Sequence, residues 1–365
     1  MQEKVNALLR FLAKPLILFY IFPWLLCILV VGTISQRYIG LYESEKLFFS
    51  SWVIWVGPVP LPGMIPVLAV LGISLTAKLI LKSPWTKKTS GTVITHMGAL
   101  LLLFGGMLTA ITAEEGSITF EPGEEMNLVS DYHQRELAVL RNDRVLLTIP
   151  REALSAGMAI VHPDLPFNVQ VMGACRHCEA GPQRYVNEQH RGLAEKIAIK
   201  AAPLRVEDEE NQFGATLSVE GAGDDQDGIY IAFEVAPHQP SITIGEDHYI
   251  IAARKSQRPL PFTVRLDSFQ KFSYPGTDMA EEYESIVSII DGEVEWQSPI
   301  RMNEPLRYKG YTLYQSSFIQ AGGQEFSVLA VVRNAGRVFP YISSIVMCIG
   351  LLIHLFARRR RKVAL

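Results

Sequence analysis

Two groups of side chains in this sequence have the types and the spacing to do chemistry. His96 lies in the nearly unbroken apolar stretch "TSGTVITHMGALLLLFGG", and His354 lies in a second apolar stretch near the carboxyl terminus. Cys175 and Cys178 form the other group, in "CRHC". A neutral imidazole can enter an apolar site and still offer a nitrogen lone pair to a metal such as haem iron. Paired cysteines can form a disulfide or exchange electrons with other thiols.

Each histidine also has a simpler interpretation. An imidazole inside a membrane can hydrogen-bond a neighbouring helix or reach the lipid headgroups, and we favour that interpretation for His354, which lies four residues before an arginine cluster. For His96 the residues alone leave both interpretations open. Small residues around it would let another helix or a flat ligand approach the backbone closely. These residues are Gly91, Gly98, Gly105 and Gly106.

The cysteine pair has three interpretations. We favour a structural disulfide or hairpin staple over a redox or thiol-relay role, and both over a metal site completed by His177 or His190. A haem-attachment site would read C-x-x-C-H, but Glu179 follows Cys178. This signal therefore does not indicate a c-type cytochrome.

The composition indicates a membrane protein. The chain has 365 residues, of which 48% are hydrophobic and 19% charged, and the apolar residues concentrate towards its two ends. A bilayer core about 30 Å thick needs roughly 20 mainly apolar residues as helix. Four segments of about that length predict transmembrane helices, at 15–34, 63–82, 91–112 and 338–357. The first is long for a signal peptide and no small-residue cleavage site follows it, so we expect a retained anchor.

The positive charges predict the orientation of these helices. Basic clusters precede the first helix, lie between the second and third, and follow the fourth, which places all three clusters and both termini in the cytoplasm. The clusters are Lys4, Arg10 and Lys14; Lys82, Lys87 and Lys88; and Arg358, Arg359, Arg360, Arg361 and Lys362. The segment 113–337 then lies on the outer side of the membrane.

The outer segment has the pattern of a β domain. Alternating stretches such as "NVQVMG", "GIYIAFEVA" and "FTVRLDSF" have the period of strands, and Asp-Gly in "IIDGEVEW" predicts a hairpin. The sequence therefore predicts an α + β membrane protein with an antiparallel β-sandwich or irregular β-barrel inserted between the third and fourth helices. We divide it into a membrane domain, 1–112, an extracytoplasmic β domain, 113–337, and a final helix with a basic tail, 338–365. The stretches "VEDEENQFG" and "GAGDDQDG" are expected to be solvated loops.

Several function classes lack their sequence signatures. The chain has no P-loop, dinucleotide fingerprint, H-E-x-x-H or G-x-S-x-G motif. Basic residues outside the three clusters are interleaved with acidic ones, so no surface for nucleic acid is expected. We assign no catalytic residue and no metal other than haem iron. The remaining histidines are treated as ordinary surface or loop residues: His133, His162, His238 and His248.

Three segments carry a resemblance to a known family. "THMGALLLLFGGMLTAITAEEGSITFEPGE", "PFTVRLDSFQKFSYPGT" and "IRMNEPLRYKGYTLYQSSF", together with the last span and its basic tail, resemble ResB-type (ResB/CcsB) cytochrome c biogenesis proteins of the system II pathway. The specific motifs lie at roughly 91–124 and 259–318. The chain looks shorter than many members, and the missing length would fall in the middle of the β domain, which includes "CRHC".

The resemblance implies a function, a partner and a cofactor. Similar proteins work in the bacterial inner membrane with a CcsA/ResC-type protein that carries a WWD motif. Together they move haem b to the outer face and attach it to C-x-x-C-H apocytochromes, with thiol-reducing proteins as further partners. His96 matches the family's transmembrane histidine, which is taken to supply one axial haem ligand. Because this chain has no Trp-Trp-Asp, we expect it to be non-catalytic alone and part of a holocytochrome c synthase, or haem lyase, complex.

Two other functions fit the same topology. A haem held between His96 and His354 could carry electrons in a membrane electron-transfer complex. Alternatively, the spans could anchor a β domain that binds or senses an external ligand. Neither accounts for "NEPLRYKGYTLYQSSF" as well as the family resemblance does.

Overall fold

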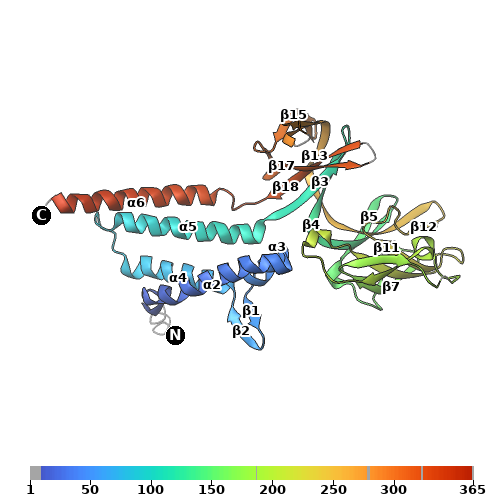
Figure 1. Ribbon diagram of the computed structural model, residues 1–365, viewed down its shortest axis with the longest axis horizontal. Coiled ribbons are helices and arrows are strands. Elements are labelled where there is room, and N and C mark those ends of the chain that lie inside the picture. Colours follow the sequence, from blue (N-terminus) through green and yellow to red (C-terminus); the bar gives the residue numbers. More distant parts are fainter. Residues whose placement is uncertain (1–9, 186, 278–279, 322–323, 364–365) are drawn as a thin grey trace. The chain divides into compact units, whose positions relative to one another are not determined.

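The computed structural model describes residues 10–185, 187–277, 280–321 and 324–363 (Figure 1). The chain divides into two compact units, one formed by Met1–Glu114 with Val332–Leu365 and the other by Glu115–Val331. Lys4 of the first basic cluster lies outside the described residues, as do the side chains of the last cluster, 358–362.

The first unit contains four long helices. They are α2 (Leu16–Ile39), α4 (Met64–Lys82), α5 (Ser90–Thr112) and α6 (Phe339–Val363). Within the described residues, each has a stretch long and apolar enough to cross a membrane, by length and composition. The four predicted spans are confirmed, and the chain is a multi-pass membrane protein. Figure 1 shows α5 and α6 running alongside each other in opposite directions.

The connection between α2 and α4 is structured. A short helix, α3 (Leu41–Ser44), and a π-helical turn, η1 (Glu45–Phe49), lead into a hairpin of β1 (Val53–Val56) and β2 (Val59–Pro62). Gly57 has φ +59° at the first position of the two-residue turn, where a side chain would be strained. The indole nitrogen of Trp24 donates a 2.9 Å hydrogen bond to the carbonyl of Pro62, which ties the hairpin to α2.

The second unit is antiparallel β structure between α5 and α6, as the sequence predicts. Its largest sheet has ten strands, in the order β15-β14-β13-β4-β3-β18-β17-β16, with β12 on β13 and β5 on β4. A four-stranded sheet has the order β11-β10-β7-β6, and β8 pairs with β9. The strand bounds are β3 Glu114–Phe120, β4 Glu125–Arg141, β5 Arg144–Pro150, β6 Ala159–Ile160, β7 Asn168–Cys175, β8 Cys178–Pro182, β9 Ile197–Ala201, β10 Gly214–Glu220, β11 Gly228–Phe233, β12 Ser241–Ile244, β13 Asp247–Ser273, β14 Ala280–Asp291, β15 Val294–Arg301, β16 Leu306–Tyr308, β17 Tyr311–Ala321 and β18 Gln324–Arg333. Short 3-10 turns lie at η2 Arg151–Ala153, η3 Gly192–Glu195 and η4 Asp208–Glu210.

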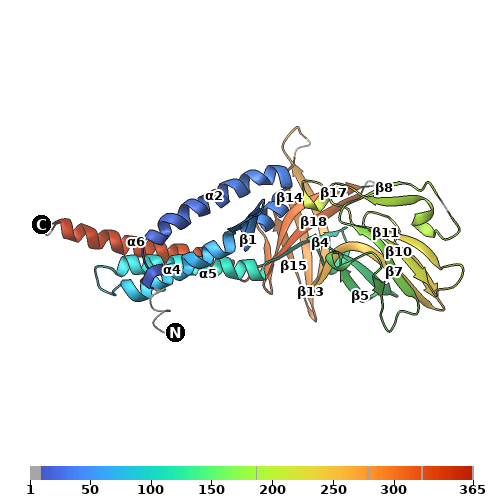
Figure 2. The same ribbon diagram turned by 90° about the horizontal axis from the view of Figure 1, so that it is seen from below.

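The two larger hydrophobic cores among the described residues of the β unit share its two longest strands. The first half of β13 contributes Tyr249 and Ile251 to a core with the four-stranded sheet, and its second half contributes Phe262 and Val264 to a core with β14, β15, β17 and β18. β13 and β4 lose their regular register between Pro259 and Val264. Proline has no N–H to donate to the ladder, and the register is irregular where β13 passes from one core to the other. Figure 2 shows both long strands running through the unit.

The predicted Asp-Gly hairpin is present. Asp291 pairs with Val294 across the turn between β14 and β15, and Gly292 there has φ +62°. "GAGDDQDG" is the loop between β10 and β11, where the Asp227 carboxylate accepts the backbone N–H groups of Gly221 and Ala222. These hydrogen bonds hold the pKa of Asp227 below its usual range.

Candidate functional site

The glycines around His96 form the contact between α5 and α6. A Cβ atom on Gly91 would lie 2.4 Å from the backbone nitrogen of His354, and one on Gly105 would lie 2.2 Å from the Cβ of Phe339. Gly98 is similarly close to α6, at 3.0 Å from the backbone oxygen of Ser343. The three glycines recur every seven residues, so they lie along one face of α5 and allow the two backbones to approach closely.

This packing decides between two alternatives that the sequence leaves open. The sequence predicts that Gly91, Gly98 and Gly105 let another helix or a flat ligand approach, and the structure confirms the helix, because α6 fills that face. Gly106 differs, because a Cβ atom there would meet nothing within 4 Å. A haem ring therefore cannot lie against the first three glycines while α5 and α6 are packed.

His96 lies on a different face of α5. At about 100° per residue it is about 140–180° around the helix from the three glycines. Leu103, on nearly the same face, reaches α4, where a Cβ atom on Gly72 would lie 3.9 Å from its Cδ1. The ring is half-buried, and its Nδ1 is buried with no hydrogen-bond partner among the described residues. An unpaired buried polar atom costs about 1–3 kcal/mol.

His354 is engaged differently. Its Nδ1 lies 3.2 Å from the hydroxyl of Thr92, which is one helical turn before His96 on α5. His354 of α6 therefore contacts α5 about one helical turn from His96. The hydrogen bond to Thr92 agrees with the simpler interpretation of His354 as a helix-packing residue.

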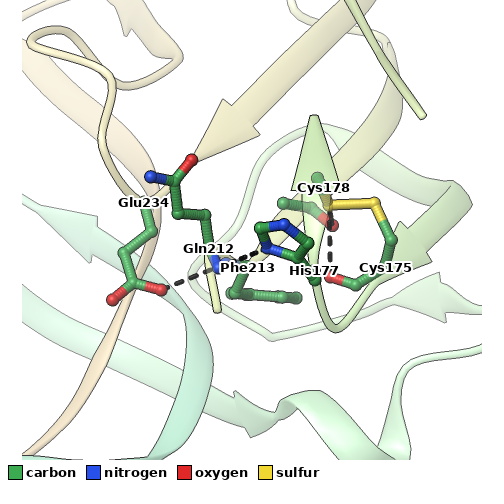
Figure 3. The surroundings of a disulfide bond; sticks show 7 residues. Cys175, His177, Cys178, Gln212, Phe213 and Glu234 are labelled. Carbon is green, nitrogen blue, oxygen red and sulfur yellow. Dashed lines mark hydrogen bonds between the residues drawn. A yellow bond between two sulfur atoms is a disulfide. The ribbon is translucent and has the colours of Figure 1, made fainter. Parts of the chain in front are cut away.

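The "CRHC" segment forms the turn between β7 and β8, and Cys175 and Cys178 are joined by a disulfide (Figure 3). This bond agrees with the favoured interpretation of the cysteine pair as a structural disulfide. A redox role for the pair stays a prediction. Cys175 is half-buried and Cys178 is completely buried among apolar side chains. Gly214 of β10 pairs with Cys175, and a Cβ atom there would lie 3.0 Å from the Cys178 sulfur. Glycine at this position makes room for the disulfide.

His177, inside the same turn, is also buried, with only 4% of its surface exposed. Its Nδ1 accepts the backbone N–H of Gln212 at 3.2 Å. A neutral ring that accepts through Nδ1 carries its proton on Nε2. That Nε2 is buried and has no partner among the described residues, so the turn holds an unpaired N–H donor. Figure 3 shows the ring between the disulfide-bonded turn and Gln212.

Charged side chains surround this turn. Asp208, only 4% exposed, lies 3.0 Å from Nδ1 of His133 and 2.6 Å from the guanidinium of Arg176. Burial alone would raise the pKa of Asp208, but the hydrogen bonds and charges of His133 and Arg176 outweigh it and hold the pKa well below its usual range.

A second ion pair, between Arg135 and Glu234, holds the segment just before β10. Arg135 of β4, with a side chain 1% exposed, donates to Glu234 at 3.1 Å. The same Glu234 oxygen accepts the backbone N–H of Phe213 at 3.1 Å. This arrangement fixes the segment whose Gln212 contacts His177.

Two expectations about this region were wrong. "VEDEENQFG" is not a wholly solvated loop, because it buries Asp208, Asn211 and Phe213. His133 is not an ordinary surface histidine, since it bonds Asp208. The metal alternative gains no support, because no group of three or more His, Cys, Asp or Glu side chains that could hold a metal occurs in the described part of the chain.

The residues of the motif region 259–318 have structural roles in the β unit. Asp267, in "VRLDSF", sits at a bulge in β13 and accepts hydrogen bonds from Ser288 at 2.6 Å and Gln297 at 2.9 Å. Lys309 and Gly310 form the turn between β16 and β17, both with positive φ. Lys309 then reaches the Asp291 carboxylate at 2.5 Å. These polar contacts therefore help to define turns and strand pairing.

One buried polar cluster also comes from this block. Gln315 accepts the hydroxyl of Ser285 at 2.6 Å, and the hydroxyls of Ser285 and Ser327 lie 2.8 Å apart. These side chains link β17, β14 and β18 inside the unit.

Comparison with known proteins identifies part of the chain. Residues 240–328 match the model of the ResB-like family. A stretch of 99 residues is 31% identical to Protein NrfI of Wolinella succinogenes, and it makes up 27% of the present chain and 11% of NrfI. The chain thus spans only a small part of the length of this curated relative. The family match covers β12 to β17 and the first half of β18, the region in which the motif block lies.

Proposed function

We propose that this ResB-type chain is a membrane subunit of the machinery that matures c-type cytochromes. The observation that carries the proposal is the match of residues 240–328 to the ResB-like family. The multi-pass helical unit supports it, because haem must pass a bilayer before it can be attached on the outer side. The chain alone is not an enzyme in this proposal, and the attachment chemistry belongs to the complex.

We assign the transported haem b to His96. Haem is a flat and largely apolar ring with two propionates, so a site within a membrane needs a nitrogen ligand and a cation near the carboxylates. His96 supplies an imidazole with a buried, unpaired Nδ1. Lys78 of α4 would neutralise a propionate. Because α6 covers the glycine face, the haem would approach from the side of α4 or from a partner subunit.

A partner of the CcsA/ResC type completes the proposed site. Such a protein would supply the second axial ligand and the Trp-rich surface that this sequence lacks. For His354 we keep the role of a helix-packing residue, because its Nδ1 lies 3.2 Å from the hydroxyl of Thr92 on α5. Lys87 and Lys88 are assigned the ordinary role of basic anchors at the cytoplasmic surface.

The β unit would receive the apocytochrome. Thioether formation requires both thiols of a C-x-x-C-H segment to be reduced and held against the haem vinyl groups, which is a positioning task. Strand β6 is one edge of the four-stranded sheet, and an extended segment could pair with it. The other edge, β11, already bonds residues 189–191 through Ile229. Loss of the β unit should then abolish apocytochrome binding, and retained binding would refute this part.

The decisive experiment is a visible spectrum of the chain purified with a CcsA/ResC-type partner. We expect a six-coordinate haem spectrum that weakens in His96→Ala and recovers when imidazole is added. His354→Ala is the matched control and should leave the spectrum unchanged. An unchanged spectrum in His96→Ala would remove His96 from the site. Reversible redox cycling without transfer to an apocytochrome would favour a subunit of an electron-transfer complex instead.

A further inference from the structure

We propose that Cys175 and Cys178 form a redox-active disulfide that exchanges with the dithiol of a C-x-x-C segment in another protein. Cys175 is the sulfur that is attacked, Cys178 is the buried sulfur that is released, and His177 is a positioning residue that stabilises the reduced form. This proposal concerns the β unit alone and does not depend on haem binding by the helices.

The two cysteines differ in accessibility in the way that exchange requires. Cys175 is half-buried at the end of β7, whereas Cys178 is completely enclosed by side chains such as Ile199 and Phe233. An external thiolate can therefore reach the first sulfur and not the second. A disulfide with one accessible sulfur is open to attack at a single defined atom, since exchange proceeds through the sulfur that the nucleophile can approach.

His177 gives the reduced state a specific stabilisation. In the oxidised turn its Nε2–H is buried without a partner in the described part of the chain, while Nδ1 is held by Gln212. Opening the disulfide frees the sulfur of Cys178, the residue next to His177 in the sequence. A released thiolate or thiol is a hydrogen-bond acceptor, so reduction supplies the partner that the donor lacks. A partner gained only on reduction shifts the equilibrium towards the dithiol.

The turn is held in place without the disulfide. The backbone N–H of Cys178 donates to Gln212 at 2.8 Å, and the carbonyl of His177 accepts the N–H of Ala202 at 3.0 Å. Arg176 adds an ion pair to Asp208 at 2.6 Å. Cys175 also pairs with Gly214 of β10, so the 212–214 segment holds both ends of the turn independently of the disulfide. The disulfide can therefore open and close within a fixed frame.

The exchange balances without any further reactant. A thiolate of the incoming dithiol attacks the Cys175 sulfur, which forms a mixed disulfide and releases Cys178 as a thiolate. The second thiol of the incoming segment then attacks the mixed disulfide, closes its own disulfide and releases Cys175. Two electrons and two protons pass from the incoming dithiol to the pair, which ends as two thiols. The reverse sequence passes them to an oxidised C-x-x-C segment.

The first test measures the equilibrium of the pair with glutathione. The full-length chain is purified in detergent without haem, with Cys27→Ser and Cys348→Ser to remove the free cysteines, and alkylation reports the reduced fraction. We expect half-reduction of the native chain at a [GSH]²/[GSSG] ratio that is at least tenfold lower than the ratio needed by His177→Asn. The asparagine oxygen can still accept the Gln212 N–H, but the Nε2–H donor is lost. His162→Asn, on the same unit, should match the parent. A pair that stays oxidised until the chain unfolds, or a His177→Asn ratio equal to that of the parent, would overturn the proposal.

The second test identifies the attacked sulfur. With Cys178→Ser, the remaining Cys175 thiol should form a mixed disulfide with an oxidised C-x-x-C-H peptide, and Cys175→Ser should form it at least tenfold more slowly. Equal or reversed rates would refute the assignment. Repeating the trap with an oxidised thioredoxin-like protein distinguishes the source of the dithiol, because faster trapping identifies the better exchange partner. Neither test involves haem, so a failure here leaves the proposed role of His96 unaffected.

Discussion

Gly91 of α5 and His354 of α6 are so close that a Cβ atom on the glycine would sit 2.4 Å from the histidine's backbone nitrogen. Such a contact cannot be relieved by moving a flexible side chain, because both partners are backbone. The position of α6, and of His354 on it, therefore depends on the absence of a side chain at residue 91.

A larger residue at this point should separate the helices. We predict that Gly91→Val lowers the stability of the detergent-solubilised chain by about 1–3 kcal/mol, since overpacking displaces a well-packed neighbour. Gly106→Val is the matched control on the same helix, because its Cβ would meet nothing within 4 Å. Thermal unfolding of both variants measures the difference. Equal melting temperatures for the two would contradict the packing described for α5 and α6.

The orientation of the chain can be tested by labelling single cysteines. In a background without Cys27 and Cys348, we predict that Glu246→Cys, in the exposed turn between β12 and β13, reacts with a membrane-impermeant maleimide in intact cells. Lys87→Cys, in the exposed connection between α4 and α5, should react only after the cells are permeabilised. The opposite pattern would place the β unit in the cytoplasm and invert the topology.

The sequence is a good guide to the elements and a poor one to the polar contacts between them. Length and apolar character are enough to find the four helices, and Asp291-Gly292 is enough to find one hairpin. The burial of Asp208 could not be predicted, because its acidic neighbours are typical of a solvated loop. Its ionic partners, Arg176 and His133, are 32 and 75 residues away in the sequence.

The packing of α5 could have been predicted more closely. Gly91, Gly98 and Gly105 recur every seven residues, which places them on one face of a helix, whereas Gly106 falls outside that series. His96 falls outside it as well. The spacing thus separates the face that packs on α6 from the face that carries the candidate ligand. Composition alone groups all four glycines together.

The buried polar cluster in the β unit should contribute measurably to stability. We predict that Gln315→Leu costs about 1–3 kcal/mol, because it leaves the buried hydroxyl of Ser285 without the acceptor it now has at 2.6 Å. Ser316→Ala, at the exposed neighbouring position, should change stability by less than about 0.5 kcal/mol. Denaturant unfolding of the full chain provides both values. A neutral Gln315→Leu would mean that the cluster is replaceable by apolar packing.

Asp208 should make the stability of the β unit depend on pH in the acidic range. Its pKa in the folded chain lies below the value of about 3.9 expected in the unfolded chain, because His133 and Arg176 stabilise the carboxylate. A carboxylate with a depressed pKa contributes its stabilisation fully above the unfolded pKa and loses it as the pH falls towards the folded pKa. We therefore predict that stability declines steeply as the pH falls below about 4.

The substitution Asp208→Asn should make that decline shallower. At neutral pH the variant should be less stable by about 2 kcal/mol, because Arg176 and His133 lose a charged acceptor, and both are partly exposed, which limits the loss. Because asparagine does not titrate, the stability difference between the two proteins should shrink as the pH is lowered from about 5 towards 2. Denaturant unfolding at a series of pH values measures this difference. Asp164→Asn, at an exposed carboxylate of the same unit, is the control and should leave the slope unchanged. If the stability difference between Asp208→Asn and the parent stayed constant across this pH range, protonation of Asp208 would not be the cause of the loss of stability in acid.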